Sequence, residues 1–191
     1  MKRKLTALLM LLALCAALLT GCSKSDGPQA VIVVRDYGTI TVALNPEVAP
    51  ITVENFVNLA KSGFYDGLTF HRIMDGFMIQ GGDPNGNGTG GSDETIKGEF
   101  SANGVANELH HTDGTISMAR PGNNMDGASS QFFITVADCS ASLDGQYAAF
   151  GRVTEGLELV HRIAGDAKPV DNNGTIPADQ QPVIERVVIA D

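Results

Sequence analysis

The sequence predicts a mainly β protein, built as a closed eight-stranded antiparallel β-barrel capped by two α-helices. Two observations predict this fold: eight short apolar or alternating runs recur along the chain, and only two segments have helical periodicity. The runs are residues 30–35, 39–44, 69–73, 78–81, 115–119, 132–136, 148–153 and 183–190. Closing such a sheet on itself removes the exposed edges that eight strands would otherwise leave.

The second of these runs shows the strand pattern most clearly. Ile40, Val42 and Leu44 alternate with smaller or more polar neighbours. This period of two residues is typical of a strand with one buried face. The preceding Tyr37-Gly38 indicates a hairpin turn that joins the first two strands.

The two helical segments lie near the two ends of the strand series. Between Pro50 and Gly63, apolar residues recur at i, i+3, i+4 and i+7, which predicts an amphipathic helix. A second helix is predicted over residues 155–164, ended by Gly165. We expect the two helices to cover the two barrel openings, and residues 165–182, rich in Pro, Asn, Asp and Gly, to form a surface loop.

The first residues of the chain have the composition of a secretory signal. Residues 2–4 are basic, residues 5–19 are apolar, and Leu-Thr-Gly precedes Cys22. The sequence Leu-Thr-Gly-Cys resembles the bacterial lipobox, which implies cleavage before Cys22 and attachment of a diacylglyceryl group to its sulfur. The expected organisation is a lipoprotein signal peptide over residues 1–21, a lipidated Cys22 with a short tether over 22–29, and one domain over 30–191. An ordinary secretory signal with an incidental cysteine is the alternative.

The charge of the chain argues against nucleic acid as a partner. Loss of Lys2, Arg3 and Lys4 with the signal would take the formal charge from −9 to −12. Such a protein is repelled by phosphate backbones and by anionic lipid, so the lipid on Cys22 would have to hold it at the membrane. We therefore expect an extracytoplasmic monomer, anchored to a bacterial membrane through Cys22.

Residues 83–94 match the calcium-binding loop of an EF-hand, with Asp83 at position 1 and Glu94 at position 12. An EF-hand needs a helix on each side, whereas a strand-like segment precedes this loop. The four histidines also lack the spacing of zinc ligands. We expect no metal and no cofactor, with calcium binding kept as a minor alternative.

Several long motifs carry the functional prediction. They are residues 70–84 (FHRIMDGFMIQGGDP), 117–120 (SMAR), 129–134 (SSQFFI) and 143–151 (LDGQYAAFG). Together they resemble the cyclophilins, over a region from about residue 30 to the C-terminus. The resemblance implies a cyclophilin-like barrel that acts as a peptidyl-prolyl cis-trans isomerase, with no cofactor.

Strand geometry supports one shared surface for these motifs. Side chains two residues apart in a strand point to the same face, so Met78 and Gln80 lie together, as do Gln131 and Phe133. The residues between them must point the other way. The barrel can therefore bury Ile79 and Phe132 in its core and present the other side chains, with Arg72, as a site.

The resemblance also implies roles for individual residues. It assigns catalysis to Arg72 and Gln80, which would hold the polar backbone of the substrate. The implied substrate-binding residues are Phe77, Met78, Ala119, Arg120, Gln131, Phe133, Leu143 and Tyr147. Rotation about an X–Pro bond meets a barrier of about 18–20 kcal/mol, which a guanidinium bonded to the amide can lower by weakening its conjugation.

Three positions depart from the best-known family pattern. Ser142 stands where many members carry tryptophan, Tyr147 where many carry histidine, and Arg120 where many carry asparagine. These departures leave open which residue is preferred before proline. The expected substrates are proline-containing, unfolded or partly folded exported proteins. A non-catalytic module that binds proline segments is the rival hypothesis, but such a module would not need the charge of Arg72.

Overall fold

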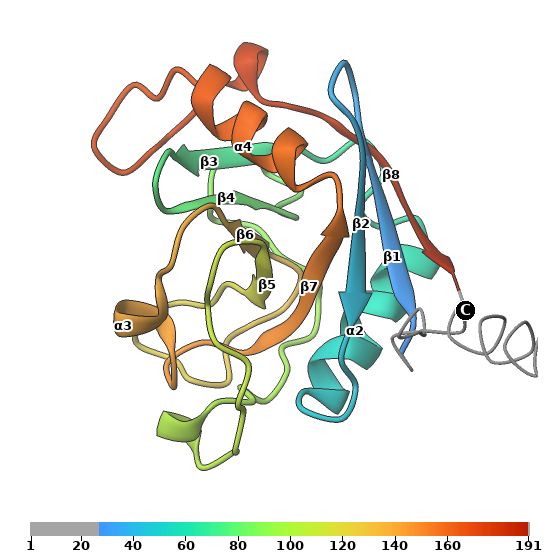
Figure 1. Ribbon diagram of the computed structural model, residues 1–191, viewed down its shortest axis with the longest axis vertical. Helices are drawn as coiled ribbons and strands as arrows, with labels where there is room; N and C mark the ends of the chain where they lie inside the picture. The colour runs from blue at the N-terminus through green and yellow to red at the C-terminus, as the bar shows by residue number, and fades with distance from the viewer. Residues whose placement is uncertain (1–26, 191) are drawn as a thin grey trace, which may run out of the picture.

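The computed structural model describes residues 27–190, and Figure 1 shows its arrangement. The predicted signal peptide and Cys22 lie outside the described residues. All eight predicted strands are present, in a single antiparallel sheet with the order β3-β4-β6-β5-β7-β2-β1-β8. Their bounds are β1 Gln29–Val34, β2 Gly38–Leu44, β3 Phe70–Met74, β4 Met78–Gly81, β5 Thr115–Met118, β6 Phe132–Thr135, β7 Ala149–Glu155 and β8 Ile184–Ala190.

The sheet is an open half-barrel, so the predicted closed barrel was wrong. Its edge strands are β3 and β8, which approach each other only at their starts. There Thr69 and Val183 form an isolated bridge, and the Phe70 amide donates to Pro182 O over 2.9 Å. Farther along β3, the residues around Gly174 and Thr175 pair with this strand, and β8 does not. The Ile73 amide donates to Gly174 O over 2.8 Å, and Thr175 forms a bridge with Arg72. The predicted surface loop thus covers one sheet edge, which satisfies its backbone groups without closing the barrel.

Both predicted helices form, at opposite ends of the sheet in Figure 1. The first, α2 (Pro50–Lys61), begins with proline, and the carboxylate of Glu99 accepts hydrogen bonds from the Ile51 and Thr52 amides over 3.1 and 2.8 Å. This carboxylate supplies the acceptor that free amides at a helix start need. No helix within residues 27–190 is long and apolar enough to cross a bilayer.

The second helix, α4 (Leu157–Asp166), begins after Gly156 and continues one residue past Gly165. The predicted stop at Gly165 was therefore slightly early. A glycine costs about 1 kcal/mol within a helix, and burial of Val160, Ile163 and Ala164 offsets that cost. Three short helical turns complete the described chain: η1 (Ser101–Asn103), α3 (Ser140–Leu143) and η2 (Ala178–Gln180).

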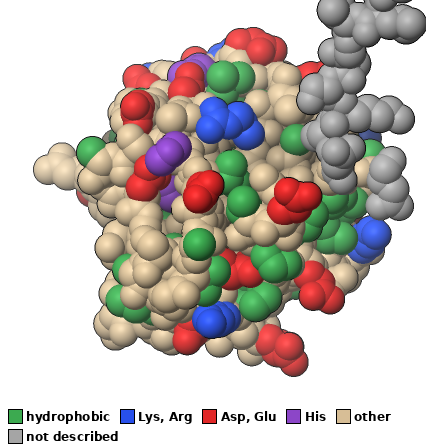
Figure 2. All heavy atoms as spheres, turned by 60° about the horizontal axis from the view of Figure 1, so that its bottom comes forward, with side chains coloured by type: hydrophobic (Ala, Val, Ile, Leu, Met, Phe, Trp, Pro, Cys, Tyr) green, Lys and Arg blue, Asp and Glu red, His purple; other side chains and the backbone are tan. Residues whose placement is uncertain are grey.

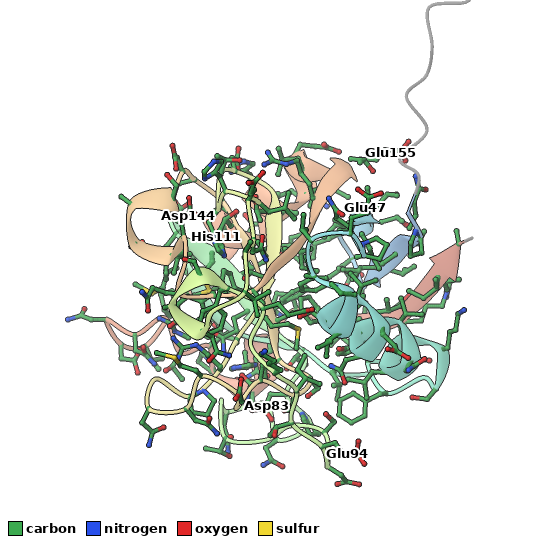
Figure 3. All side chains as sticks on the ribbon, turned by 90° about the horizontal axis from the view of Figure 1, so that it is seen from below. Glu47, Asp83, Glu94, His111, Asp144 and Glu155 are labelled. Carbon is green, nitrogen blue, oxygen red and sulfur yellow. The ribbon has the colours of Figure 1, made fainter. Side chains whose placement is uncertain are left out.

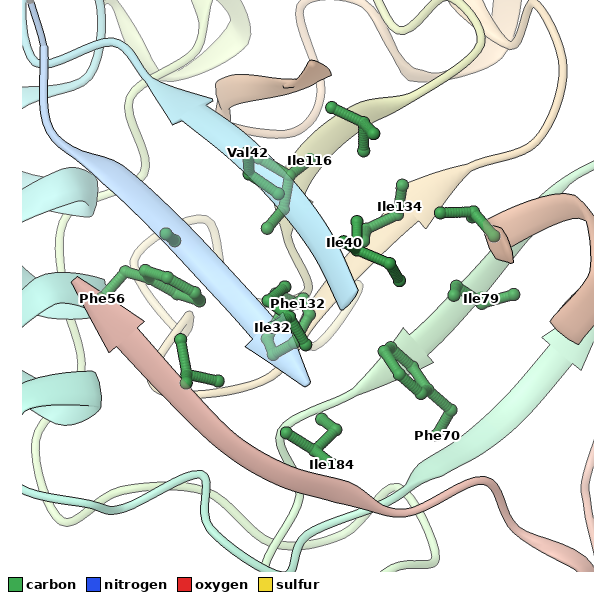
Figure 4. Packing of buried hydrophobic residues seen from close by; sticks show 14 of the residues in the cluster. Ile32, Ile40, Val42, Phe56, Phe70, Ile79, Ile116, Phe132, Ile134 and Ile184 are labelled. Atoms are coloured by element: carbon green, nitrogen blue, oxygen red, sulfur yellow. The ribbon is translucent and has the colours of Figure 1, made fainter. Parts of the chain in front are cut away.

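The core fills the concave face of the sheet. Figure 4 shows isoleucine, valine and phenylalanine side chains from strands across the sheet and from α2 converging there. Phe132 lies among aromatic rings, with edge-to-face contacts to Phe56, Tyr65 and Phe70 at centroid separations of 5.5–6.1 Å. This core fixes the four strands β3, β4, β6 and β5, whose other face carries the candidate site.

Candidate active site

The candidate site begins as a row of side chains across four neighbouring strands. In the pairing register Arg72 of β3 lies opposite Gln80 of β4, which lies opposite Phe133 of β6, which lies opposite Ser117 of β5. These residues share the face that points away from the core, as the alternation predicted. Four residues far apart in sequence therefore become direct neighbours.

A cleft of about 410 Å³ opens along this face. Nine of the ten predicted site residues line it: Arg72, Phe77, Met78, Gln80, Ala119, Arg120, Phe133, Leu143 and Tyr147. The tenth, Gln131, lines an adjoining cavity of about 400 Å³, whose wall Gln80, Ala119 and Arg120 share. The structure therefore gathers the whole predicted set around two connected hollows.

One end of the cleft is apolar. Met78, Phe133 and Leu143 are 1%, 4% and 6% exposed and form a cluster separate from the main core, with Phe77 packed beside them. Phe133 also makes an edge-to-face contact with Tyr147, at a centroid separation of 5.8 Å. Rings held in this way form a preformed apolar surface of the kind that small ligands bind.

Arg72 is fixed beside this apolar surface by three hydrogen bonds. Its Nε donates to Asn173 O over 2.7 Å, Nη1 to Gln80 Oε1 over 3.0 Å, and Nη2 to Met74 Sδ over 3.3 Å. Burial lowers the pKa of the guanidinium from its ordinary value, while Tyr147 and Asp171 oppose that shift. Because arginine stays protonated in proteins, Arg72 presents a fixed positive charge to the cleft.

Gln80 belongs to a chain of amides that orients Arg72. Because its Oε1 accepts from Arg72, its Nε2 is the atom that donates to Gln131 Oε1, over 2.9 Å. Gln131 in turn donates to Gly90 O over 2.7 Å. This donor order leaves each amide a single orientation. Gln80 thus lies between Arg72 and Gln131 and is hydrogen-bonded to both.

The segment that holds Arg72 Nε is itself braced by Asp171. The Asp171 carboxylate accepts from the amides of Asn173 and Thr175, both over 3.0 Å, and from the Thr175 hydroxyl over 2.8 Å. Asn173 and Thr175 also line the cleft. Neither residue was predicted as part of the site, because residues 165–182 were expected to form a surface loop and no local pattern ties that loop to β3.

Arg120 lies at the wall between the two hollows. Its Nε and Nη2 donate to Gln146 O over 3.1 and 3.0 Å, and Nη1 donates to Pro121 O over 3.1 Å. The guanidinium carbon lies 5.1 Å from the ring centre of Phe100 and 4.9 Å from that of Tyr147. Arg120 is therefore held in place by two aromatic rings and by backbone carbonyls.

Two buried histidines adjoin the site. The ring of His111 stacks on Phe133, and its nitrogens contact Asp144 Oδ1 at 2.8 Å and Ser117 Oγ at 3.0 Å. Figure 3 shows His111 and Asp144 next to each other. His71 lines the cleft and is also buried, but neither of its ring nitrogens has a hydrogen-bond partner. The sequence shows only that the four histidines lack the spacing of zinc ligands, and no local pattern indicates that His71 and His111 adjoin the site.

The loop kept as a minor candidate for calcium binding is held together by hydrogen bonds to Asp83. This buried carboxylate accepts hydrogen bonds from the amides of Asn85, Asn87 and Gly88. Burial alone would raise the pKa of Asp83, but the three donors outweigh it and lower that pKa. In Figure 3 Glu94 lies at the edge of the molecule, apart from Asp83. Residues 27–190 contain no cluster of three potential metal-ligating side chains.

The matches to known proteins cover the part of the chain that contains these motifs. The family model described as "Cyclophilin type peptidyl-prolyl cis-trans isomerase/CLD" matches residues 30–190. A peptidyl-prolyl cis-trans isomerase-like 1 protein of Rhizopus delemar is 47% identical over 136 residues, which cover 71% of this chain and 79% of that protein.

Other similar proteins differ in size and in source. The human peptidylprolyl isomerase domain and WD repeat-containing protein 1 is 45% identical over 147 residues, which cover 74% of this chain but only 22% of the human protein. A crystal structure of a Cryptosporidium parvum cyclophilin-type isomerase, obtained in the presence of the dipeptide Ala-Pro, superposes with a TM-score of 0.74 at 29% identity. That match covers 85% of this chain and 99% of the other.

Proposed function

The chain belongs to the cyclophilin-type peptidyl-prolyl cis-trans isomerase family, and on that premise we propose that it isomerises X–Pro bonds in exported proteins from a lipid anchor on a bacterial membrane. The enzyme class follows from the family. The exported substrates, the anchor and the roles of individual residues are the proposal. The observation that carries the residue roles is a fixed guanidinium, Arg72, beside an apolar surface open to solvent.

The proposed mechanism uses these two features together. The proline ring binds against Phe77, Met78, Phe133 and Leu143 and displaces water from this apolar surface. Arg72 then donates to the substrate amide as its nitrogen becomes pyramidal and loses conjugation with the carbonyl. Gln80 and Gln131 keep the guanidinium aimed, so little reorganisation is needed at the transition state. No bond is made or broken, so the reaction requires only binding and a placed charge.

The proposed location rests on the N-terminal residues. A basic start, an apolar run and Leu-Thr-Gly before Cys22 are the features that support a lipoprotein signal. Only seven residues separate Cys22 from Ala30, and an extended chain spans at most about 3.5 Å per residue. A domain anchored in this way stays close to the membrane surface, where exported chains emerge unfolded.

The test is the membrane partition of a Cys22→Ser variant in a bacterial host that processes lipoproteins. We expect the parent to sediment with membranes, because its diacylglyceryl group supplies the more than one acyl chain that stable anchoring needs. Cys22→Ser lacks the sulfur that carries this group, so it should be soluble or unprocessed. Cys139→Ser is the matched control, since it removes the other thiol of the mature chain and should leave partition unchanged. Equal membrane binding of parent and Cys22→Ser would refute the anchor.

A further inference from the structure

We propose that Arg120 makes this enzyme selective for proline segments that carry an acidic side chain next to the proline. The inference rests on the proposed function, because it assumes that the proline ring occupies the apolar end of the cleft. It concerns the second hollow, which adjoins that end and shares Arg120 with it.

The distribution of charge favours acidic ligands in the two hollows. The protein is acidic overall, with 22 Asp and Glu against 13 Lys and Arg, and acidic side chains are spread over the face shown in Figure 2. The two hollows have the opposite character. Among the residues that line them, the charged ones are Arg72 and Arg120, and neither wall contains an Asp, Glu or Lys of the described chain. A concave surface with charges of one sign concentrates ligands of the other sign.

The charge of Arg120 is held in place and is not neutralised. Its hydrogen bonds go to backbone carbonyls, and no carboxylate within residues 27–190 forms an ion pair with it. Contacts with the Phe100 and Tyr147 rings fix the guanidinium without cancelling its charge. A side chain ordered in advance loses little entropy when a substrate binds.

Arg120 lies next to the apolar surface proposed to bind proline. Gln80, Ala119 and Arg120 line both hollows, so a peptide whose proline fills the first places a neighbouring side chain toward the second. The rest of the second wall consists of small or polar residues: Gly88, Thr89, Gly90, Gly91, Ser92, Pro121, Gly127, Ser129 and Gln131. These residues leave room for a side chain, and Arg120 supplies the charge that an aspartate or glutamate would contact.

A purely structural role for Arg120 is the alternative. In that case the guanidinium only braces the segment at Gln146 against the segment at Pro121, and its loss lowers activity equally on all substrates. The charge of the substrate tests which role is correct, because an arginine with a purely structural role does not distinguish glutamate from glutamine.

The experiment compares peptides that differ only in one residue beside a single proline. Glutamate, glutamine or lysine is placed in turn at the two positions before proline and at the one after it. Exchange between cis and trans forms is followed by NMR, because this readout adds no protease preference of its own. The full mature chain is assayed as parent, Arg120→Gln and Arg120→Lys, with Arg152→Gln as control because Arg152 is an exposed arginine outside both hollows.

In the parent we expect kcat/KM to be about 3–10-fold higher for glutamate than for glutamine at one of the three positions, the range for a partly exposed charge contact. The ratio should fall to about 1 in Arg120→Gln, persist in part in Arg120→Lys, remain unchanged in Arg152→Gln, and shrink with added salt. Equal ratios in parent and Arg120→Gln, or a parent ratio of 1 at every position, would overturn the inference while leaving the isomerase intact. A parent inactive on every peptide would overturn the proposed function and this inference with it.

Discussion

Two rows of side chains cross the same four strands, one residue apart, and differ in almost every property. On the concave face Ile73, Ile79, Ile134 and Ile116 lie opposite one another, and each is 0% exposed. On the other face the neighbouring row consists of Arg72, Gln80, Phe133 and Ser117. Because successive residues of a strand alternate in direction, one short sequence motif builds both the core and the site.

The two faces differ most in what covers them. The isoleucine row belongs to the main apolar core, inside the curve of the sheet and with α4 next to β4 (Figure 4). In the described part of the chain, α3 and loops lie beside the other row and leave the cleft open. Burial alone therefore does not separate core from site, since Phe133 and Met78 are nearly as buried as the isoleucines. The difference lies in polar neighbours and in access from solvent.

The largest expected effect tests this difference with two adjacent phenylalanines. Phe132→Ala should lower the free energy of unfolding by about 3–5 kcal/mol, because it leaves a closed cavity among aromatic rings. Phe133→Ala should cost at least about 1 kcal/mol less, because water can enter the space beside the cleft, but it should reduce kcat/KM more. Urea unfolding and a peptide isomerisation assay measure the two quantities. If both variants lose equal stability and activity follows stability alone, the division between the faces is wrong.

The second effect concerns the charged member of the outer row. Arg72→Ala should lower kcat/KM by about 10²–10³-fold, the loss typical of one preorganised donor, or about 2.7–4 kcal/mol. The free energy of unfolding should change little, because Arg72 faces the cleft and not the core. Arg152→Ala, at an exposed arginine outside the cleft, should retain full activity. Full activity of Arg72→Ala would refute its catalytic role and favour a binding module.

The outer and inner rows could be predicted from the sequence because the alternation that produces them depends on neighbouring residues of a single strand. The period-2 alternation within residues 78–81 and 132–136 placed Ile79 and Phe132 in the core and Gln80 and Phe133 outside, and the structure confirms this placement. The strands and both long helices were also correct, since each has its own local pattern. The residues around the cleft came from the resemblance, which carries information from many sequences that one sequence lacks.

The features that were missed depend on contacts between distant segments. Nothing near Asn173 shows that its carbonyl accepts from Arg72, 101 residues away. The same is true of closure of the barrel, which depends on whether β8 or the segment around Thr175 lies along β3. Both segments can pair with an open edge, and local propensity does not choose between them. Arg120 was expected among the substrate-binding residues and lines both hollows, but its contacts with Phe100 and Gln146 were invisible in the sequence.

The smallest expected effect compares two buried histidines, one with partners and one without. Burial lowers the pKa of His111 from its ordinary value, with Asp144 opposing and His110 adding to the shift. Burial also lowers the pKa of His71, with Asp83 opposing and Arg72 adding to the shift. His111 nevertheless contacts the Asp144 carboxylate directly, whereas the nitrogens of His71 have no partner and the oxygens of Asp83 already accept from backbone amides.

Both histidines should make the protein less stable in mild acid. When a histidine has a lower pKa folded than unfolded, the unfolded chain binds more protons below about pH 6.5, so the free energy of unfolding falls with pH there, by at most about 1.4 kcal/mol per pH unit for each group. His71→Gln should flatten this dependence between pH 7.5 and 5.5 more than His111→Gln, because a proton on His71 would meet Arg72 and no free carboxylate. Urea unfolding at a series of pH values measures the slopes, with the exposed His161→Gln as control. A slope left unchanged by His71→Gln would show that water or a local opening accommodates the proton, and that the cleft wall is less closed at His71 than its burial indicates.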